Sequence, residues 1–495
     1  MLAITRRCLA FRRAQALRAH STRVISTSSF RPCLRDFALS LARKQPCFAV
    51  APERVRVLTQ PHDFYTTLLD MIRGAQRRIF LSSLYIGSSE HELITTLHDA
   101  LIRNPFLQLY LQLDLNRSTR PGASSTTTLL QPLLQNFPDR VHVSLFRSPK
   151  LKGLMARLVP PRFNEGWGTW HAKIYGADDN VMISGANLNK SYFTDRQDRY
   201  LHFSAEPAMA NYCLAFLETA SGFSYRLLPP SGNGPSTPTW TNPTMHPHSI
   251  EPHAGKAFAT LQSVSRRVAR AKTESEVLVF PIIQAGQFGI REEEECLNSL
   301  FDHLAATKSD TRPCLNLTSG YFGLYKPYQD RILSTSVDTR IICASPKANG
   351  FYGSRGLSGR IPEGYTLLEQ RFMRAVGREG KSCLPSARHH EEGSNVELSE
   401  WQKDGWTYHA KGIWVSPTPT TPPELTVFGS TNLNSRSAHL DTELSFILLT
   451  SAASLRQKLH EELQGLRAHA IPWRGAERRV RLGTKALVGM VGGML

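Results

Sequence analysis

The chain has 495 residues, a formal net charge of +18 at pH 7 and 41% hydrophobic residues. This length allows two domains with full cores, and the ordinary hydrophobic content indicates a globular protein. No run of 18 or more apolar residues occurs, so the sequence does not predict a transmembrane helix. The basic charge favours acidic partners, such as phospholipid surfaces, nucleotides or nucleic acid, without choosing among them.

Residues 1–35 form an Arg-rich N-terminal segment. It holds eight arginines and no lysine, and the first acidic residue of the chain is Asp36. Spaced Leu, Ala, Phe and Arg residues favour an amphipathic helix up to about Ala19, and Ser and Thr follow. This composition is typical of a mitochondrial transit peptide. The alternative is a disordered basic tail.

Residues 50–228 are predicted to form a first α/β domain. A helical pattern in HDFYTTLLDMIRGAQRR precedes the strand IFLSSLYIG, and HELITTLHDALIRN and LQLYLQLDLN repeat the order of helix and strand. Residues 229–256 are rich in Pro, Ser, Thr and Gly, which indicates a linker or a long surface loop.

Residues 257–470 repeat the same order and are predicted to form a second domain. A helix leads to the strand EVLVFPIIQ, the helix EEEECLNSLFDHLAAT, and the strands CLNLTSGYF and DTRIICASP. Alternating elements predict an α/β fold with a parallel or mixed sheet in each half. Residues 471–495 are basic and then apolar, which is compatible with an interfacial anchor on anionic lipid or with a frayed tail.

A motif occurs once in each predicted domain. The first copy reads HAKIYGADDNVMISGANLN from His171, and the second reads HAKGIWV from His409 and resumes as TVFGSTNLN. In both copies a carboxylate follows the Asn of the motif by eleven residues, as Asp198 after Asn187 and Glu443 after Asn432. A single His-x-Lys occurs by chance, whereas the full string in two copies predicts one active site assembled between two similar domains.

The spacing of the motif suits the chemistry of a phosphate diester. Residues i and i+2 of a strand share a face, so His171 projects with Lys173, and His409 with Lys411. One His can attack phosphorus while the other protonates the leaving group. The Lys and Asn side chains would neutralise the phosphoryl oxygens, and Asp198 and Glu443 are placed to fix the imidazole tautomers.

The doublet resembles the HxKxxxxD signature of the phospholipase D superfamily. His171, Lys173 and Asp178 fit it in full, and the resemblance makes all three catalytic. The second copy departs from it, because Ser416 stands where the Asp is expected and Glu424 is the nearest carboxylate beyond. The resemblance implies two similar phospholipase D-like α/β domains with the active site at their interface.

Further segments narrow the resemblance. ASPKANGFYGSRGLSGRIPEGY, PIIQAGQFGIREEE, SGYFGLYKPY and SYFTDRQDRY are similar to the mitochondrial phosphatidylglycerophosphate synthases of this superfamily. The resemblance implies transfer of a phosphatidyl group from CDP-diacylglycerol to glycerol 3-phosphate, with release of CMP, by a protein peripheral to the mitochondrial inner membrane. His171 would be the nucleophile and His409 the acid and base, although the near symmetry allows the reverse.

A second anion site is expected for the phosphate of the acceptor. Lys347, Arg355 and Arg360 in the Gly-rich loop are the candidates, with Arg117 and Arg120 as alternatives. No cofactor and no metal is predicted, since the eight cysteines form no CxxC pair or Cys/His cluster. A hydrolase of the same superfamily remains an alternative. A nucleic-acid phosphodiesterase is also possible, but no interleaving of stacking aromatics with basic residues supports it.

Overall fold

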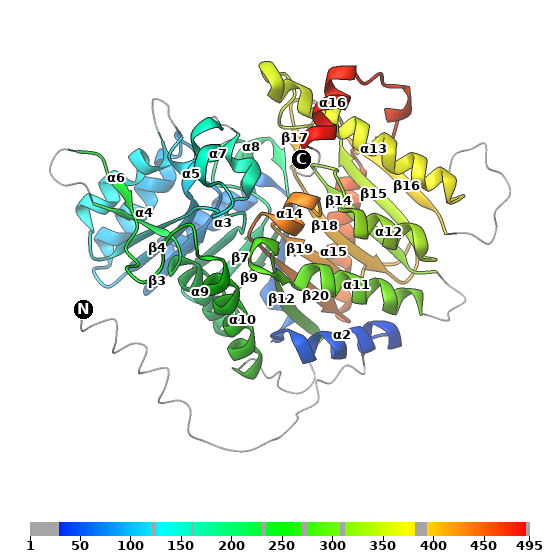
Figure 1. The fold of residues 1–495 in the computed structure, drawn as a ribbon. Coiled ribbons are helices and arrows are strands. Elements are labelled where there is room, and N and C mark those ends of the chain that lie inside the picture. Colours follow the sequence, from blue (N-terminus) through cyan, green and yellow to red (C-terminus); the bar gives the residue numbers. More distant parts are fainter. Residues whose placement is uncertain are drawn as a thin grey trace.

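The computed structural model of the protein describes residues 29–120, 125–159, 163–229, 234–268, 276–306, 312–381 and 394–491. Two mixed sheets lie side by side with helices packed around them, and the N-terminal and C-terminal halves meet in the middle of Figure 1. The predicted α/β class is therefore confirmed.

The first sheet has nine strands in the order β11-β10-β5-β4-β3-β6-β7-β9-β2. Parallel pairing joins β3 to β4 and β4 to β5, while β3, β6, β7, β9 and β2 pair antiparallel. The strands are β2 (Val55–Leu58), β3 (Arg78–Ser82), β4 (Gln108–Asp114), β5 (Val141–Phe146), β6 (Ile174–Ala177), β7 (Asn180–Ser184), β9 (Tyr200–Phe203), β10 (Tyr225–Leu228) and β11 (Thr237–Thr239). The helices of this half are α3 (Pro61–Gly74), α4 (His91–Arg103), α5 (Leu115–Ser118), α6 (Thr126–Asn136), α7 (Gly153–Leu158), α8 (Ser191–Thr194) and α9 (Pro207–Ser221).

The second sheet follows the order β1-β12-β20-β19-β18-β14-β15-β16-β21, and β13 pairs with β12 off this path. The strands are β1 (Phe48–Val50), β12 (Val277–Ala285), β13 (Ile290–Arg291), β14 (Cys314–Ser319), β15 (Asp338–Ala344), β16 (Val396–Trp401), β18 (Lys411–Ser416), β19 (Leu425–Gly429), β20 (Glu443–Thr450) and β21 (Ala470–Pro472). Its helices are α2 (Pro32–Lys44), α10 (Glu251–Val268), α11 (Glu292–Ala305), α12 (Lys326–Ser334), α13 (Ile361–Arg378), α14 (Ser435–His439), α15 (Ala453–Arg467) and α16 (Leu482–Val491).

The two sheets repeat one arrangement of seven strands. The order β5-β4-β3-β6-β7-β9-β2 of the first sheet matches β16-β15-β14-β18-β19-β20-β12 of the second, with the same parallel and antiparallel neighbours. The His-Lys motifs precede or begin the equivalent strands β6 and β18. The internal repeat seen in the sequence is thus a repeat of the fold.

The halves share a core. One buried apolar cluster contains residues of both sheets, including Phe203 and Phe428, whose rings stack with centroids 6.1 Å apart. Arg199 enters the second half, where it pairs with Glu462 at 2.8 Å and lies 3.7 Å from the centre of the Trp414 ring. A small parallel sheet of β8 (Arg196–Gln197) and β17 (Thr407–Tyr408) also joins the halves. This packing fixes the two motif strands relative to each other.

The chain ends depart from the predicted boundaries. The helix α2 packs on the second half, where Phe30, Leu34 and Phe37 are buried, and β1 extends the second sheet at β12. Residues 1–28 of the predicted leader lie outside the described residues, whereas its last residues belong to this packed segment. Long-range pairing of this kind leaves no local signal in the sequence.

The predicted linker and tail also contain regular structure. Within 229–256 the strand β11 pairs with β10, and α10 begins at Glu251 rather than after the linker. In the C-terminal segment β21 pairs with β16, and Arg478 and Arg481 form ion pairs with Glu400 and Glu363. Among the described helices, none combines the length and apolar character needed to span a bilayer.

Candidate active site

The two His-Lys motifs meet where the halves join. The backbone N–H of His171 donates to the carbonyl of Thr442 at 2.9 Å, and that of His409 donates to the carbonyl of Gln197 at 2.8 Å. Each histidine is therefore hydrogen-bonded through its backbone to the other half. Both histidines are buried, with exposed side-chain fractions of 5% and 4%.

The first histidine is held by a carboxylate of the second half. The Nδ1 atom of His171 lies 2.9 Å and 3.0 Å from the two carboxylate oxygens of Glu443, which also accepts from Ser430 and Ser437. Burial lowers the pKa of His171, and the charge of Glu443 opposes this shift. Burial disfavours ionisation of Glu443, but His171, Lys173 and Ser430 together lower its pKa below the usual range. Glu443 is thus an anion that keeps a proton on Nδ1 and leaves Nε2 free.

The second histidine is held by a carboxylate of the first half. The Nδ1 atom of His409 lies 2.7 Å from Asp198 and 2.7 Å from the Nζ atom of Lys411. Burial lowers the pKa of His409 well below its ordinary value, and Lys411 and Arg196 add to the effect. Burial also raises the pKa of Asp198, although Lys411 opposes it.

The orienting carboxylates are therefore exchanged between the halves. The sequence placed Asp198 and Glu443 beside the imidazoles but did not assign a partner to either. In the fold, Asp198 serves the motif of the second half and Glu443 that of the first. One complete His–carboxylate pair needs both halves.

The lysines and one of the asparagines complete the buried site. Burial lowers the pKa of Lys173 to about 7 and lowers that of Lys411. A side chain at Gly185 would come within 2.6 Å of both Lys411 Nζ and Asp198, so the close approach requires glycine. Asn432 has a buried Oδ1 without a hydrogen-bond partner among the described residues, so this acceptor is open to a donor group. The Nδ2 group of the same amide is the part that could donate to a phosphoryl oxygen.

Asn187 lies in the first half-site and is already engaged. Its Oδ1 atom accepts from the backbone N–H of Leu84 at 3.3 Å, and its Nδ2 donates to the Tyr192 hydroxyl at 3.1 Å. That hydroxyl is 3.4 Å from Nε2 of His409. Asn187, predicted as a site residue, thus contacts the Tyr192 hydroxyl, which in turn lies beside His409.

Two tyrosines and an arginine that were not predicted as site residues surround His409. The rings of Tyr192 and Tyr321 meet its imidazole edge to face at 5.1 Å and 5.4 Å. The guanidinium of Arg196 lies over the Tyr192 ring at 4.6 Å and donates to the Thr407 hydroxyl at 2.9 Å. The sequence did offer one signal for Arg196, which is its position two residues before Asp198.

The equivalent position in the second copy is an acid. Asp441 stands two residues before Glu443, and with His171 these carboxylates place possible metal ligands within 4.8 Å of one another. Asp441 Oδ1 accepts from the backbone and hydroxyl of Thr169, and Oδ2 accepts from Arg436. Because protein donors engage both oxygens, the cluster fits a hydrogen-bond network better than a metal site.

The third residue of the sequence signature is not in this site. Asp178 lies in the turn between β6 and β7 at φ 52°, and its carboxylate accepts from the backbone N–H groups of Gln76, Arg77 and Arg78. Five residues along an extended chain separate it from Lys173 by roughly 15 Å. The catalytic role predicted for Asp178 is therefore corrected to a turn-stabilising one.

In the second copy, the residues at and beyond this position also lie outside the site. Ser416 is buried at the end of β18, and Glu424 forms ion pairs with Arg31 at 2.5 Å and Arg456 at 3.5 Å. Neither residue is among the contacts described for the histidines. Neither copy thus places the residue at this position against the histidines.

The predicted acceptor residues separate in the fold. Lys347 lines a pocket beside β17, but Arg355 and Arg360 do not. Arg360 lies beside α16, where a side chain at Gly483 would approach its guanidinium to 2.9 Å. Arg117 lies 4.3 Å from the centre of the Tyr85 ring, and Arg117 and Arg120 form ion pairs with Glu165.

Comparisons with known proteins agree on one family. The chain is 34% identical over 462 residues to the mitochondrial CDP-diacylglycerol–glycerol-3-phosphate 3-phosphatidyltransferase of Gallus gallus, covering 85% of this chain and 79% of the relative. It is 33% identical over 495 residues to the CDP-diacylglycerol–glycerol-3-phosphate 3-phosphatidyltransferase of Schizosaccharomyces pombe, covering 90% and 95%. No protein-family model matches the chain.

A solved structure shares the fold. The phosphatidylserine synthase of Haemophilus influenzae superposes with a TM-score of 0.66 at 19% identity, covering 93% of this chain and 98% of that protein. At this identity the likeness concerns the fold alone. The identity to the curated relatives, over most of both chains, shows that the chain belongs to the CDP-diacylglycerol–glycerol-3-phosphate 3-phosphatidyltransferase family.

Proposed function

We propose that the protein transfers the phosphatidyl group of CDP-diacylglycerol to glycerol 3-phosphate, giving phosphatidylglycerophosphate and CMP. This product leads toward phosphatidylglycerol and cardiolipin. The observation that carries the proposal is the pair of buried imidazoles, each fixed by a carboxylate of the opposite half and each accompanied by a lysine. The names of the relatives supply the two substrates.

In the first step His171 attacks the phosphatidyl phosphorus through Nε2. A P–N bond forms as the P–O bond to CMP breaks, and protonated His409 gives its proton to the departing oxygen. Anionic Glu443 supports His171 as the nucleophile because it stabilises the positive charge that the imidazole gains. Lys173, Lys411 and Asn432 would stabilise the phosphoryl oxygens.

In the second step glycerol 3-phosphate takes the place of CMP. His409, now neutral, removes the proton of the attacking hydroxyl as the new P–O bond forms and the P–N bond breaks. In the free protein burial keeps the pKa of His409 well below its ordinary value, which makes its imidazole an available base for this step. The negative phosphodiester, once bound beside the imidazole, favours the protonated form that the first step needs. Both histidines return to their starting states.

The decisive experiment supplies purified protein with CDP-diacylglycerol, with and without glycerol 3-phosphate. We expect phosphatidylglycerophosphate and CMP in equal amounts, and little CMP without the acceptor. Release of CMP and phosphatidic acid at the same rate without acceptor would replace the transferase with a hydrolase of the same superfamily.

We also propose that the protein is mitochondrial, as several relatives are named, and that a removable leader ends before Phe30. Cleavage at residue 35 would remove the buried Phe30 and Leu34 and the ion pair of Arg31 with Glu424. Fusion of residues 1–29 to a reporter should deliver it to mitochondria. N-terminal sequencing of the mature protein that begins beyond Leu34 would refute the boundary.

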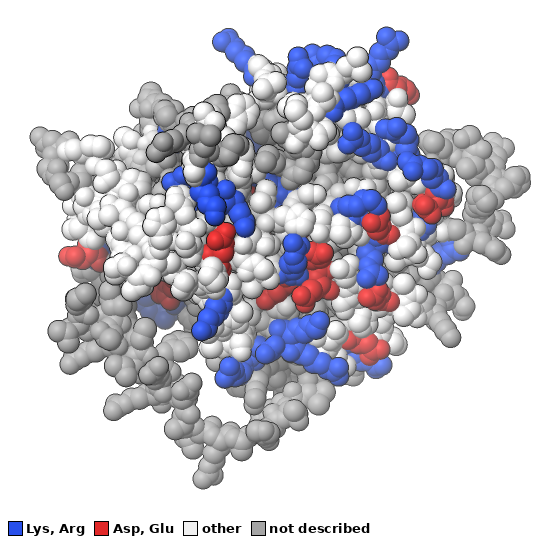
Figure 2. Space-filling model, viewed as in Figure 1, with Lys and Arg blue, Asp and Glu red and all other residues white. Residues whose placement is uncertain are grey.

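Peripheral attachment to the inner membrane is proposed from the C-terminal helix. Leu482 and Met490 of α16 are 82% and 77% exposed, and Lys485 shares this helix face. Basic side chains gather above α13 and α16 along the upper edge of Figure 2. Replacing Leu482 and Met490 by Asp should reduce flotation with anionic vesicles, whereas unchanged flotation would place the contact elsewhere.

A further inference from the structure

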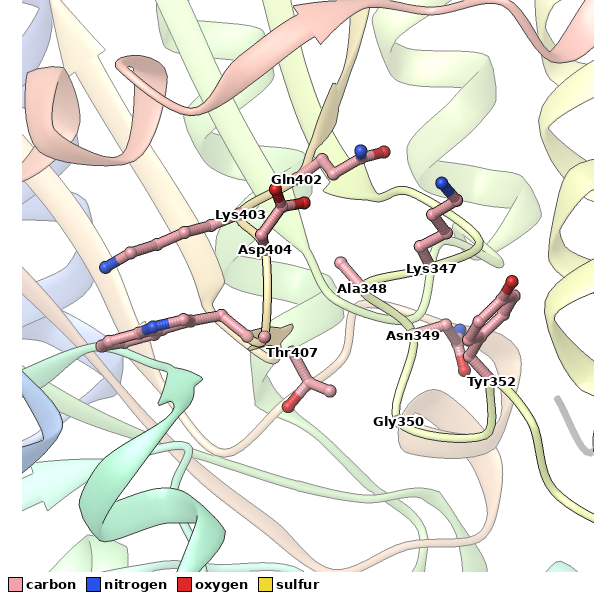
Figure 3. A pocket seen from close by; sticks show the side chains of 11 residues that line it. Lys347, Ala348, Asn349, Gly350, Tyr352, Gln402, Lys403, Asp404 and Thr407 are labelled. Carbon is pink, nitrogen blue, oxygen red and sulfur yellow. The ribbon is translucent and has the colours of Figure 1, made fainter.

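A pocket of about 360 Å³ lies between the loop that contains Lys347 and the turn between β16 and β17. Its walls come from residues 347–352 and 402–407 (Figure 3). This volume falls in the range of small-molecule sites. The Gly-rich loop was noted in the sequence, but the turn Gln402–Trp406 was not.

The pocket adjoins the chain segment that carries His409. Thr407 lines it and stands two residues before His409 on the same chain segment. The backbone N–H of Tyr408 donates to the carbonyl of Ala348 at 2.8 Å, which ties the loop to β17. A side chain at Gly350 would come 3.1 Å from the guanidinium of Arg196 and 3.2 Å from the Tyr321 hydroxyl. Gly350, which lines the pocket, therefore lies beside two of the groups that surround His409.

The lining offers opposite charges on opposite walls. Figure 3 shows Lys347 and Asp404 on the two sides of the pocket, with Gln402 at its upper edge and Tyr352 beside Lys347. Lys403 points away from Lys347, and its Nζ atom lies over the Trp406 ring, 3.5 Å from the ring centre. Lys347 can pair with a phosphate, and Asp404 can accept a hydrogen bond from an amino group. A nucleotide carries both groups.

We propose that this pocket binds the cytidine nucleotide half of CDP-diacylglycerol, an assignment that rests on the proposed function. Arg196 and Lys347 hold the phosphate of the departing CMP, and Asp404 accepts a hydrogen bond from the exocyclic amine of cytosine. Tyr352 supplies an aromatic surface for the base. The leaving group then departs beside His409, the residue that protonates it.

A nucleotide fits this pocket better than the second substrate does. Glycerol 3-phosphate has no donor group for Asp404 beyond its hydroxyls, and its dianion would face a carboxylate. Uridine carries a carbonyl where cytidine carries the amine, so Asp404 would repel it. The pocket thus predicts a preference for CMP over UMP, not merely an affinity for phosphate.

The test is equilibrium binding of CMP to the full chain by calorimetry, with UMP, glycerol 3-phosphate and inorganic phosphate as comparison ligands. Lys347→Ala should raise the dissociation constant of CMP by about tenfold or more, the scale of one charge-assisted contact. Asp404→Asn should bring CMP and UMP within about threefold of each other, because an amide serves both bases.

Lys458→Ala is the control, since it removes an exposed lysine of α15 that is not part of the pocket lining. Its CMP affinity should stay within about twofold of the unaltered protein, and thermal unfolding should show that all three variants are folded. CMP affinity that is unchanged in both Lys347→Ala and Asp404→Asn overturns the assignment. Weaker binding of glycerol 3-phosphate alone overturns it in favour of the acceptor.

Transfer activity of the same preparations reports the proposed function separately. An active protein whose CMP affinity ignores Lys347 and Asp404 refutes the subsite only. A protein that binds CMP through these residues and transfers no phosphatidyl group refutes the function and leaves a cytidine nucleotide site.

Discussion

The two half-sites share one sequence pattern but differ in charge. His171 faces Glu443, whose pKa is lowered, with Asp441 close by. His409 faces Asp198, whose pKa is raised, and lies beside Lys411 and Arg196. One imidazole thus sits in an anionic environment and the other in a cationic one. The repeat thus supplies two similar half-sites, and residues around each motif give the two imidazoles different electrostatic surroundings.

The strongest test of this division is removal of each histidine. His171→Ala and His409→Ala should each reduce transfer by about a thousandfold or more, because one removes the nucleophile and the other the acid and base. In His409→Ala, rapid quenching should trap phosphorus on His171. More than about a tenth of normal activity in either variant would contradict the shared site, and an adduct on His409 in His171→Ala would reverse the roles.

Removal of the exchanged carboxylates should have the next largest effect. Glu443→Gln and Asp198→Asn should each cost roughly a hundredfold, since the imidazole loses the partner that fixes its tautomer. Glu443→Gln should also lower the pKa of His171 further, because Glu443 raises it. NMR titration of the imidazoles measures this, and a shift of His409 instead would disprove the cross-pairing.

The difference in charge between the half-sites can be probed at Arg196, which occupies the position of Asp441 in the other copy. Arg196→Gln should raise the KM for CDP-diacylglycerol by about ten- to a hundredfold, as expected for loss of one charge-assisted contact. Arg196→Lys should restore part of the affinity. Substrate titrations at fixed lipid surface concentration provide the measurement. An unchanged KM would mean that Arg196 only packs on Tyr192.

The pH dependence should reflect the first half-site. Lys173 has a pKa of about 7 in the free protein, so it loses its proton and its positive charge as pH rises through that value. We expect kcat/KM to fall up to tenfold per pH unit above about 7, because a neutral amine attracts the phosphate weakly. Lys173→Met should have low activity and no such alkaline limb. If kcat/KM of this variant still falls at alkaline pH, the titration of another group causes the fall.

The smallest effect on catalysis is expected at Asp178. Asp178→Ala should leave kcat within about twofold but destabilise the fold by about 1–3 kcal/mol, because three backbone N–H groups lose their acceptor. Asp178→Asn is the control, since it keeps an acceptor and tolerates positive φ. Chemical denaturation and steady-state rates measure the two effects. Loss of activity in both variants at normal stability would return Asp178 to the site.

The sequence alone was enough to predict the repeat, the α/β class and the motif residues that the fold brings together. His171, Lys173, His409 and Lys411 were identifiable because strand periodicity and a twofold motif are local signals. Local pattern also misplaced Asp178, since a spacing cannot tell a turn acceptor from a catalytic carboxylate.

Which of these groups lie next to one another depends on the packing of the two halves. The exchange of Glu443 and Asp198 between the halves depends on how two sheets pack, and such contacts span hundreds of residues. The same holds for α2 and β1, which lie on the second half although the chain passes next into the first. Burial then set the pKa values of the histidines and lysines, because desolvation depends on the completed core rather than on neighbouring residues in the chain.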